Sequence, residues 1–269
     1  MQRSSDFHLA TEFFEHLSAA QRRVLLLDEG TLAGSPVSSR TRAASTIDIN
    51  HLLERVLHET DTQLVIITSG DARELQSAMK LNGTPEIWGG NGRERILPSG
   101  EYSAESVDPV QSRALIIARN VLVRQNLESH IEEVDGGIAL RWRGLTQPAR
   151  DHARRLALRA WKPIAEENRL QLAEREGGLE LNASYGTRTE AVRRLLGDLK
   201  KSGVLAYLGV DERDEDIFRS LLPPHLPVLM RAESRVSAAR LCLKGSEDLS
   251  EFLHEWLAAC GLAREEIDR

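Results

Sequence analysis

Acidic and hydroxyl side chains stand at the ends of three apolar segments of the sequence. Asp28 and Glu29 follow the first segment, Ser69 lies at the end of the second, and Asp211 ends the third. Carboxylates transfer protons when their oxygens come within about 3 Å of the reacting atom. Such residues also begin turns and cap helices, but their recurrence at three segment ends favours a shared site.

These apolar segments, and a fourth further along the chain, are typical of strands buried on both faces of a parallel sheet. Helical patterns separate them, and this alternation predicts parallel βαβ units. Open α/β sheets bind ligands at the carboxyl ends of their strands, so the polar residues mark the predicted site. The strand segments lie at 23–28, 63–70, 204–211 and 226–230, and the helical patterns at 49–60, 72–81, 187–202 and 214–222.

Residues 107–183 show a different pattern. An Asp-Gly pair at 135–136 separates two short alternating segments, which is a strong signal for a β-hairpin, and glycines at 177–178 join a second strand pair. We therefore expect a small antiparallel sheet with helices on one face, inserted as a domain at 107–183 between core segments 1–106 and 184–269. Its predicted helices are 109–127 and 147–167, and its predicted strands are 130–134, 138–143, 170–174 and 179–182.

Composition restricts the class of protein. The 269 residues are 41% apolar and carry a formal charge of −6, which allows a sizeable core and argues against general nucleic-acid binding. The sequence contains no apolar run of about 18 residues, so we expect no membrane span. The two cysteines lack metal-ligand spacing and are typical of reduced thiols in a cytoplasmic protein. Six arginines at 141–159 indicate either a solvated helix face or an anion-binding surface.

The order of these segments resembles the trehalose-6-phosphate phosphatases of the haloacid-dehalogenase (HAD) superfamily nearly end to end. In that family the first core strand ends in Asp-x-Asp-Gly-Thr-Leu, whose first Asp attacks phosphorus and whose second Asp exchanges protons. Residues 27–32 read Leu-Asp-Glu-Gly-Thr-Leu, so here the two acids are adjacent. The resemblance implies an α/β fold with a HAD-like, Rossmann-like parallel-sheet core and an inserted α/β (C2-type) cap domain. It implies Asp28 and Glu29 as the catalytic pair.

Further motifs carry the resemblance. Ser69 lies in the second motif, whose hydroxyl holds the phosphoryl group, and Asp71 stands where the family usually has Arg. Arg188 takes the position of the family's phosphate-binding Lys. Glu94 belongs to a segment similar to Gly-x-His-Gly-x-Glu, and Arg143 matches an arginine near the sugar. The resemblance thus implies phosphate binding by Ser69 and Arg188, and substrate binding by Glu94 and Arg143.

The last motif concerns the metal. The family's Gly-Asp-Asp-x-x-Asp-Glu reads Gly-Val-Asp-Glu-Arg-Asp-Glu at 209–215. That family holds Mg²⁺ with a first-motif carboxylate, a backbone carbonyl and a last-motif Asp. The resemblance therefore implies Asp28, Asp211 and Asp214 as metal ligands, with Val210 replacing one acid. Because Mg²⁺ requires near-octahedral oxygen geometry, this replacement weakens the predicted site.

Alternate side chains of a strand point to opposite faces, so adjacent Asp28 and Glu29 do not both enter one site without a bulge. With the other replacements, this predicts a catalytically impaired pseudo-phosphatase. Its expected role is binding or regulation in sugar-phosphate and trehalose metabolism, with a sugar phosphate as ligand. Two alternatives stay open. One is an active Mg²⁺-dependent sugar-phosphate phosphatase that uses Asp28 as nucleophile on trehalose 6-phosphate. The other is a scaffold subunit for a sugar-nucleotide glycosyltransferase.

Overall fold

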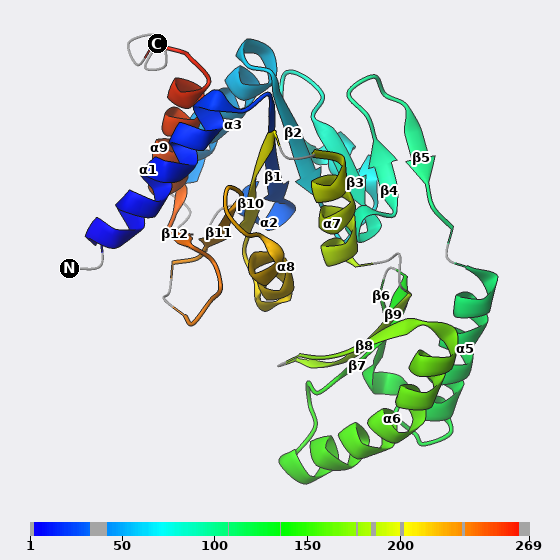
Figure 1. Ribbon diagram of the computed structural model, residues 1–269. Coiled ribbons are helices and arrows are strands. Elements are labelled where there is room, and N and C mark those ends of the chain that lie inside the picture. Colours follow the sequence, from blue (N-terminus) through cyan, green and yellow to red (C-terminus); the bar gives the residue numbers. More distant parts are fainter. Residues whose placement is uncertain are drawn as a thin grey trace.

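The computed structural model of the chain describes residues 3–32, 42–106, 108–134, 136–175, 177–183, 187–199, 202–232 and 235–263. These residues form two separate sheets (Figure 1). The eight-stranded sheet has the order β12 (Leu241–Leu243), β11 (Leu226–Met230), β10 (Gly203–Gly209), β1 (Arg22–Asp28), β2 (Thr62–Ile67), β3 (Glu86–Gly89), β4 (Glu94–Ile96) and β5 (Tyr102–Ala104). The four-stranded sheet has the order β6 (Ile131–Val134), β7 (Gly137–Arg141), β9 (Gly178–Ala183) and β8 (Leu170–Arg175).

The six strands from β12 to β3 are parallel, which confirms the predicted fold class. All four apolar segments named above form strands of this sheet. The antiparallel addition of β4 and β5 beside β3 was not predicted. Both added strands are short, and all residues of β5 are exposed, so neither has the continuous apolar run by which buried strands are recognised.

Helices cover both faces of the large sheet (Figure 1). On β1, Leu25 and Leu27 pack into one hydrophobic cluster while Val24 and Leu26 pack into the other, as the alternation of a strand requires. The first face is covered by α1 (Arg3–Ala19), α3 (Arg42–Glu59) and α9 (Ser246–Ala259), and the second by α7 (Arg188–Leu199) and α8 (Glu215–Ser220). The remaining short helices of the core are α2 (Glu29–Leu32), α4 (Ala72–Ala78), η1 (Gly90–Gly92) and η3 (Glu212–Asp214).

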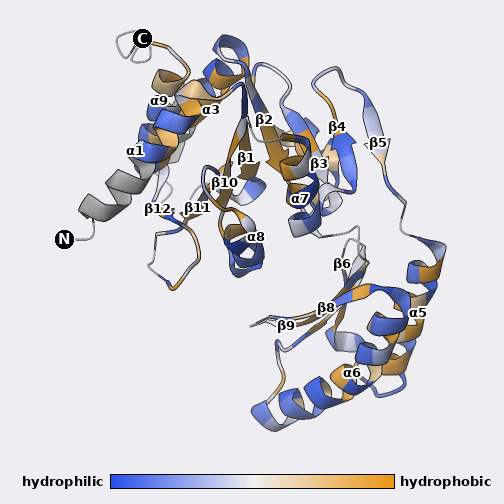
Figure 2. Cartoon of the chain, viewed as in Figure 1, coloured by the Kyte–Doolittle hydropathy of each residue, from blue (hydrophilic) through white to orange (hydrophobic). Residues whose placement is uncertain are grey.

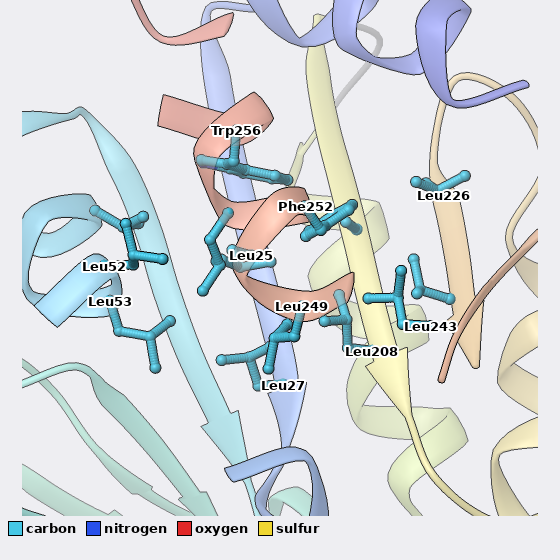
Figure 3. Packing of buried hydrophobic residues seen from close by; sticks show 14 of the residues in the cluster. Leu25, Leu27, Leu52, Leu53, Leu208, Leu226, Leu243, Leu249, Phe252 and Trp256 are labelled. Carbon is cyan, nitrogen blue, oxygen red and sulfur yellow. The ribbon is translucent and has the colours of Figure 1, made fainter. Parts of the chain in front are cut away.

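The first cluster holds the centre of the core (Figure 3). Leu249, Phe252 and Trp256 of α9 lie over the strands, close to Leu25 and Leu27. Their side chains are at most 4% exposed, and the indole nitrogen of Trp256 donates to Thr62 Oγ1 over 3.0 Å. Burial of apolar area on both faces therefore fixes the strands whose carboxyl ends carry the polar residues.

The four-stranded sheet has its own hydrophobic cluster and its own helices, α5 (Pro109–Val123) and α6 (Gln147–Asn168), with η2 (Glu128–His130) between α5 and β6. Trp161 is fully buried in this cluster and donates to the carbonyl of Ala118 over 3.1 Å, which ties α6 to α5. Figure 2 shows orange residues along the core strands and blue residues on the outer sides of the helices. We propose that residues 107–183 form a cap domain and that 1–106 and 184–269 form the core domain.

Within the part of the chain that the structure describes, no helix is long and apolar enough to cross a membrane.

Candidate active site

The three polar strand ends meet at one edge of the large sheet. Strand β1 lies between β10 and β2, with Leu27 opposite Leu208 and Asp28 opposite Ile67. Ser69 follows β2 by two residues, and Asp211 follows β10 by two residues. Because all three strands are parallel, Asp28, Ser69 and Asp211 lie at the same edge, as the sequence predicts.

Asp28 is the buried acid of this edge, with 4% of its surface exposed. Its Oδ1 accepts a hydrogen bond from the backbone N–H of Gly30 over 2.7 Å, and its Oδ2 forms an ion pair with Arg188. Gly30 has no room for a side chain: a Cβ would lie 2.8 Å from Asp28 Oδ1 and 2.9 Å from a methyl group of Val210. The glycine and the valine therefore close the space beside the carboxylate.

Burial raises the pKa of Asp28 from its ordinary value of 3.8 to about 6. The Arg188 guanidinium opposes this rise, the nearby Asp214 adds to it, and the Gly30 N–H opposes it. The ionised carboxylate is therefore less favourable here than in water, despite its cationic partner.

Asp214 shares Arg188 with Asp28 and has no exposed surface. Its Oδ1 accepts from Tyr207 Oη over 2.5 Å and from Arg188 Nη1 over 3.0 Å. Its Oδ2 accepts from the backbone N–H groups of Val210 at 2.8 Å and Asp211 at 3.0 Å. Four donors saturate this carboxylate, so it serves as an internal acceptor that shapes the last-motif loop.

Arg188 joins the two acids. It is the first residue of α7, and its Nη1 contacts both Asp28 and Asp214. Burial alone would lower the pKa of Arg188, but Tyr207, Asp28 and Asp214 together raise it above the ordinary value. We call Asp28, Arg188, Tyr207 and Asp214 the buried carboxylate cluster. In it, two carboxylates that are held out of water share one guanidinium.

The second predicted acid, Glu29, belongs to a different element. Asp28 ends strand β1, and Glu29 is the first residue of helix α2. In the described part of the chain, no hydrogen bond or ion pair fixes the Glu29 carboxylate beside Asp28. A general acid has to be held within hydrogen-bond reach of the leaving atom, and the structure supplies no such restraint for Glu29.

The residues present do not fit a Mg²⁺ ion. Asp28 is engaged by Gly30 and Arg188, and Asp214 is saturated. Asp211 Oδ1 accepts from the backbone N–H of Arg213 over 2.6 Å, where it caps η3. Among the described residues, no group of three carboxylate, histidine or cysteine side chains is placed to hold a metal. Mg²⁺ needs several oxygens around one point, and here a guanidinium lies between the acids.

Two of the predicted binding residues, Ser69 and Glu94, lie near the start of α4. Ser69 is exposed, and among the described residues its hydroxyl has no hydrogen-bond partner. Glu94 Oε2 accepts from the backbone N–H of Ala72 over 2.8 Å at the start of α4. In this structure Glu94 therefore binds the protein's own backbone, and its contact with a substrate stays a prediction.

Asp71, which stands where the family usually has Arg, also caps α4. Its Oδ1 accepts from the backbone N–H groups of Arg73 at 2.7 Å and Glu74 at 3.0 Å. We expect Asp71→Ala to lower the free energy of unfolding by about 1 kcal/mol, because two N–H groups at the helix start lose their acceptor. Urea unfolding measures this, with Asp61→Ala as an exposed control. A change below about 0.3 kcal/mol would contradict the capping role.

Arg143 lies in the cap, two residues after β7, and is exposed. Within the described residues, no hydrogen bond or ion pair connects it to the buried carboxylate cluster, so its role in binding a sugar stays a prediction.

Sequence reasoning missed Tyr207, which hydrogen-bonds Asp214. The one signal for it was a phenol inside an otherwise apolar strand segment.

The chain has the HAD-like fold of the trehalose-6-phosphate phosphatases. It is similar to a trehalose-6-phosphate phosphatase from Aspergillus fumigatus, at 18% identity over 92% of this chain and 96% of that one, with a TM-score of 0.73. It is also similar to the C-terminal domain of a C. albicans trehalose-6-phosphate phosphatase, at 18% identity over 94% and 97%, with a TM-score of 0.61. A third similar structure is the C-terminal domain of the Candida albicans trehalose synthase regulatory protein, at 12% identity over 89% and 96%, with a TM-score of 0.64. No family model matches the chain, and no curated protein sequence matches it.

Proposed function

We propose that this chain is a pseudo-phosphatase that binds a sugar phosphate without hydrolysing it and acts in the regulation of sugar-phosphate and trehalose metabolism. One observation carries the proposal: the Arg188 guanidinium bridges Asp28 and Asp214, in the space between the acids that a catalytic metal would need. A methyl group of Val210 lies against Gly30. At the position of Val210 the family has a further carboxylate.

The chemistry that such a site lacks is nucleophilic attack and proton transfer. Asp28 is paired with a cation and is partly protonated near pH 6, which lowers its nucleophilicity. Glu29 is not held at a position from which it could protonate a leaving oxygen. The groups suited to anion binding, Ser69 and Arg143, are exposed and free of ion pairs among the described residues. Binding can therefore persist where hydrolysis does not.

The test is phosphate release from trehalose 6-phosphate and a panel of sugar phosphates, with and without Mg²⁺. We expect no release above that of Asp28→Asn, and we expect calorimetric titration with trehalose 6-phosphate to give a binding signal that Ser69→Ala and Arg143→Gln weaken. Mg²⁺-dependent turnover that Asp28→Asn abolishes would overturn the proposal and establish the active phosphatase instead. Binding of neither Mg²⁺ nor sugar phosphate would leave only the role described next.

A scaffold or regulatory role toward a glycosyltransferase is the second function, and a specific surface favours it. The exposed side chains of Arg155, Arg159 and Lys162 follow one face of α6, and none has an ion-pair partner among the described residues. One similar structure is named a trehalose synthase regulatory protein. Reversal of these three charges is expected to abolish co-purification with a glycosyltransferase from the native cytoplasm, while Lys80→Glu on the core should not. Equal recovery with both variants would exclude this surface.

A further inference from the structure

A buried carboxylate of the cap is shared by two arginines, one from the cap and one from the core. Glu180 lies on β9 and is 8% exposed. Its Oε1 accepts from Arg141 Nη1 of neighbouring β7 over 2.7 Å and lies 3.3 Å from Arg213 Nη2 of η3. Among the described residues, the Glu180–Arg213 ion pair is the one that connects the cap to the core.

The cap alone satisfies Glu180 incompletely. Arg141 also forms an ion pair of 2.5 Å with Glu132 of β6, so two carboxylates share this one guanidinium. A carboxylate that is removed from water needs full charge compensation. Arg213 supplies the second positive charge only when the cap lies against the core. The electrostatic environment of Glu180 therefore favours the closed arrangement.

The core partner belongs to the loop that shapes the candidate site. The backbone N–H of Arg213 donates to Asp211 Oδ1, and Asp214, the next residue, accepts from Arg188 and Tyr207. Arg213 is the middle residue of the short helix η3, which Asp211 caps and Asp214 ends. The ion pair with Glu180 therefore connects the cap to the loop that holds Asp211 and Asp214.

We propose that Glu180 and Arg213 form a latch that holds the cap closed over the carboxyl edge of the sheet in the free protein. Opening of the latch leaves Glu180 with one shared guanidinium and gives ligands wider access to the edge at Asp28. Arg213 has 47% of its side chain exposed, so the ion pair is weak and sensitive to salt. A weak latch suits a cap that opens and closes repeatedly. The latch does not depend on whether the site hydrolyses anything.

The experiment measures the distance between cap and core by single-molecule energy transfer. Dyes are placed at Arg159→Cys on α6 and Glu251→Cys on α9, in a background with Cys242→Ser and Cys260→Ser. We expect Glu180→Gln to lower the ratio of closed to open molecules by about two- to fivefold, the range for a partly exposed ion pair. Arg213→Gln should give the same shift, and the double variant should add nothing to either single change.

Salt and a matched control separate the latch from other effects. Raising NaCl from about 0.05 M to 0.5 M should open the unsubstituted latch and leave the Glu180→Gln protein unchanged. Glu174→Gln removes an ion pair of Arg154 within the cap and should leave the cap-to-core distance as it was. Additive effects of the two latch substitutions, or an unchanged distance in both, would overturn the proposal. Because the readout is a distance, it is independent of the phosphate-release assay.

Discussion

Replacing Arg188 by methionine is expected to lower the free energy of unfolding by about 3–5 kcal/mol at pH 7.5, the cost of leaving buried carboxylates without their cation. Arg188 contacts Asp28 and Asp214, which are 4% and 0% exposed. Methionine keeps most of the apolar stem, so the decrease in unfolding free energy results from the missing charge and not from lost packing. Urea unfolding followed by circular dichroism at several pH values measures it.

The pH dependence separates an electrostatic loss from a general defect. Arg188 lowers the pKa of Asp28 against the effect of burial. Without Arg188 this pKa rises further, so acid protonates Asp28 in the variant and removes one of the two buried charges. We therefore expect the stability difference to shrink between pH 7.5 and pH 5. Arg193→Met, on the same helix and with 61% of its side chain exposed, should cost less than about 0.5 kcal/mol at both pH values. A loss for Arg188→Met that is independent of pH would contradict the cluster.

The parallel core was predictable because its strands can be recognised from the local sequence as apolar segments. The segment that ends at Asp28 is apolar on both faces, and strand β1 has buried residues on both sides of the sheet. The Asp-Gly signal at 135–136 likewise marked the hairpin of β6 and β7 in the cap. The edge strands β4 and β5 carry no such pattern, because they are short and exposed and are held by their pairing with β3. Their existence depends on tertiary context.

The site was predictable in position but not in chemistry. That Asp28, Ser69 and Asp211 share one edge follows from parallel strands alone. That Arg188 pairs with both Asp28 and Asp214 depends on contacts between segments that are distant in sequence. No local pattern encodes such contacts. The same holds for Glu180, whose strand alternation places it on a face but does not reveal Arg213 as its partner.

Asp28→Asn is expected to stabilise the protein at neutral pH, with a gain that disappears in acid. The pKa of Asp28 is raised from 3.8 in the unfolded chain to about 6 in the folded protein. Well below pH 3.8 the carboxyl group is protonated in both states, and the native carboxyl makes no pH-dependent contribution. As pH rises from 4 to 6, the unfolded chain releases its proton while the folded protein retains it, so stability falls. Above pH 6 to 7 the loss levels off at about 3 kcal/mol, since one pKa unit corresponds to about 1.4 kcal/mol.

Asparagine has the shape of the protonated carboxyl group and does not ionise, so the variant escapes this loss. The difference in unfolding free energy between Asp28→Asn and the unsubstituted protein should therefore increase by about 2–3 kcal/mol from pH 4 to pH 7.5. Arg188 keeps Asp214 as its partner in the variant, so no cation is left unpaired. Asp61→Asn, which removes an exposed carboxylate near β2, controls for the change in net charge. Urea titrations at half-unit pH steps give the curve. A difference that stays flat, or one that decreases toward neutral pH, would show that Arg188 stabilises the ionised Asp28 more than burial penalises it, and Asp28 would then be available as a nucleophile.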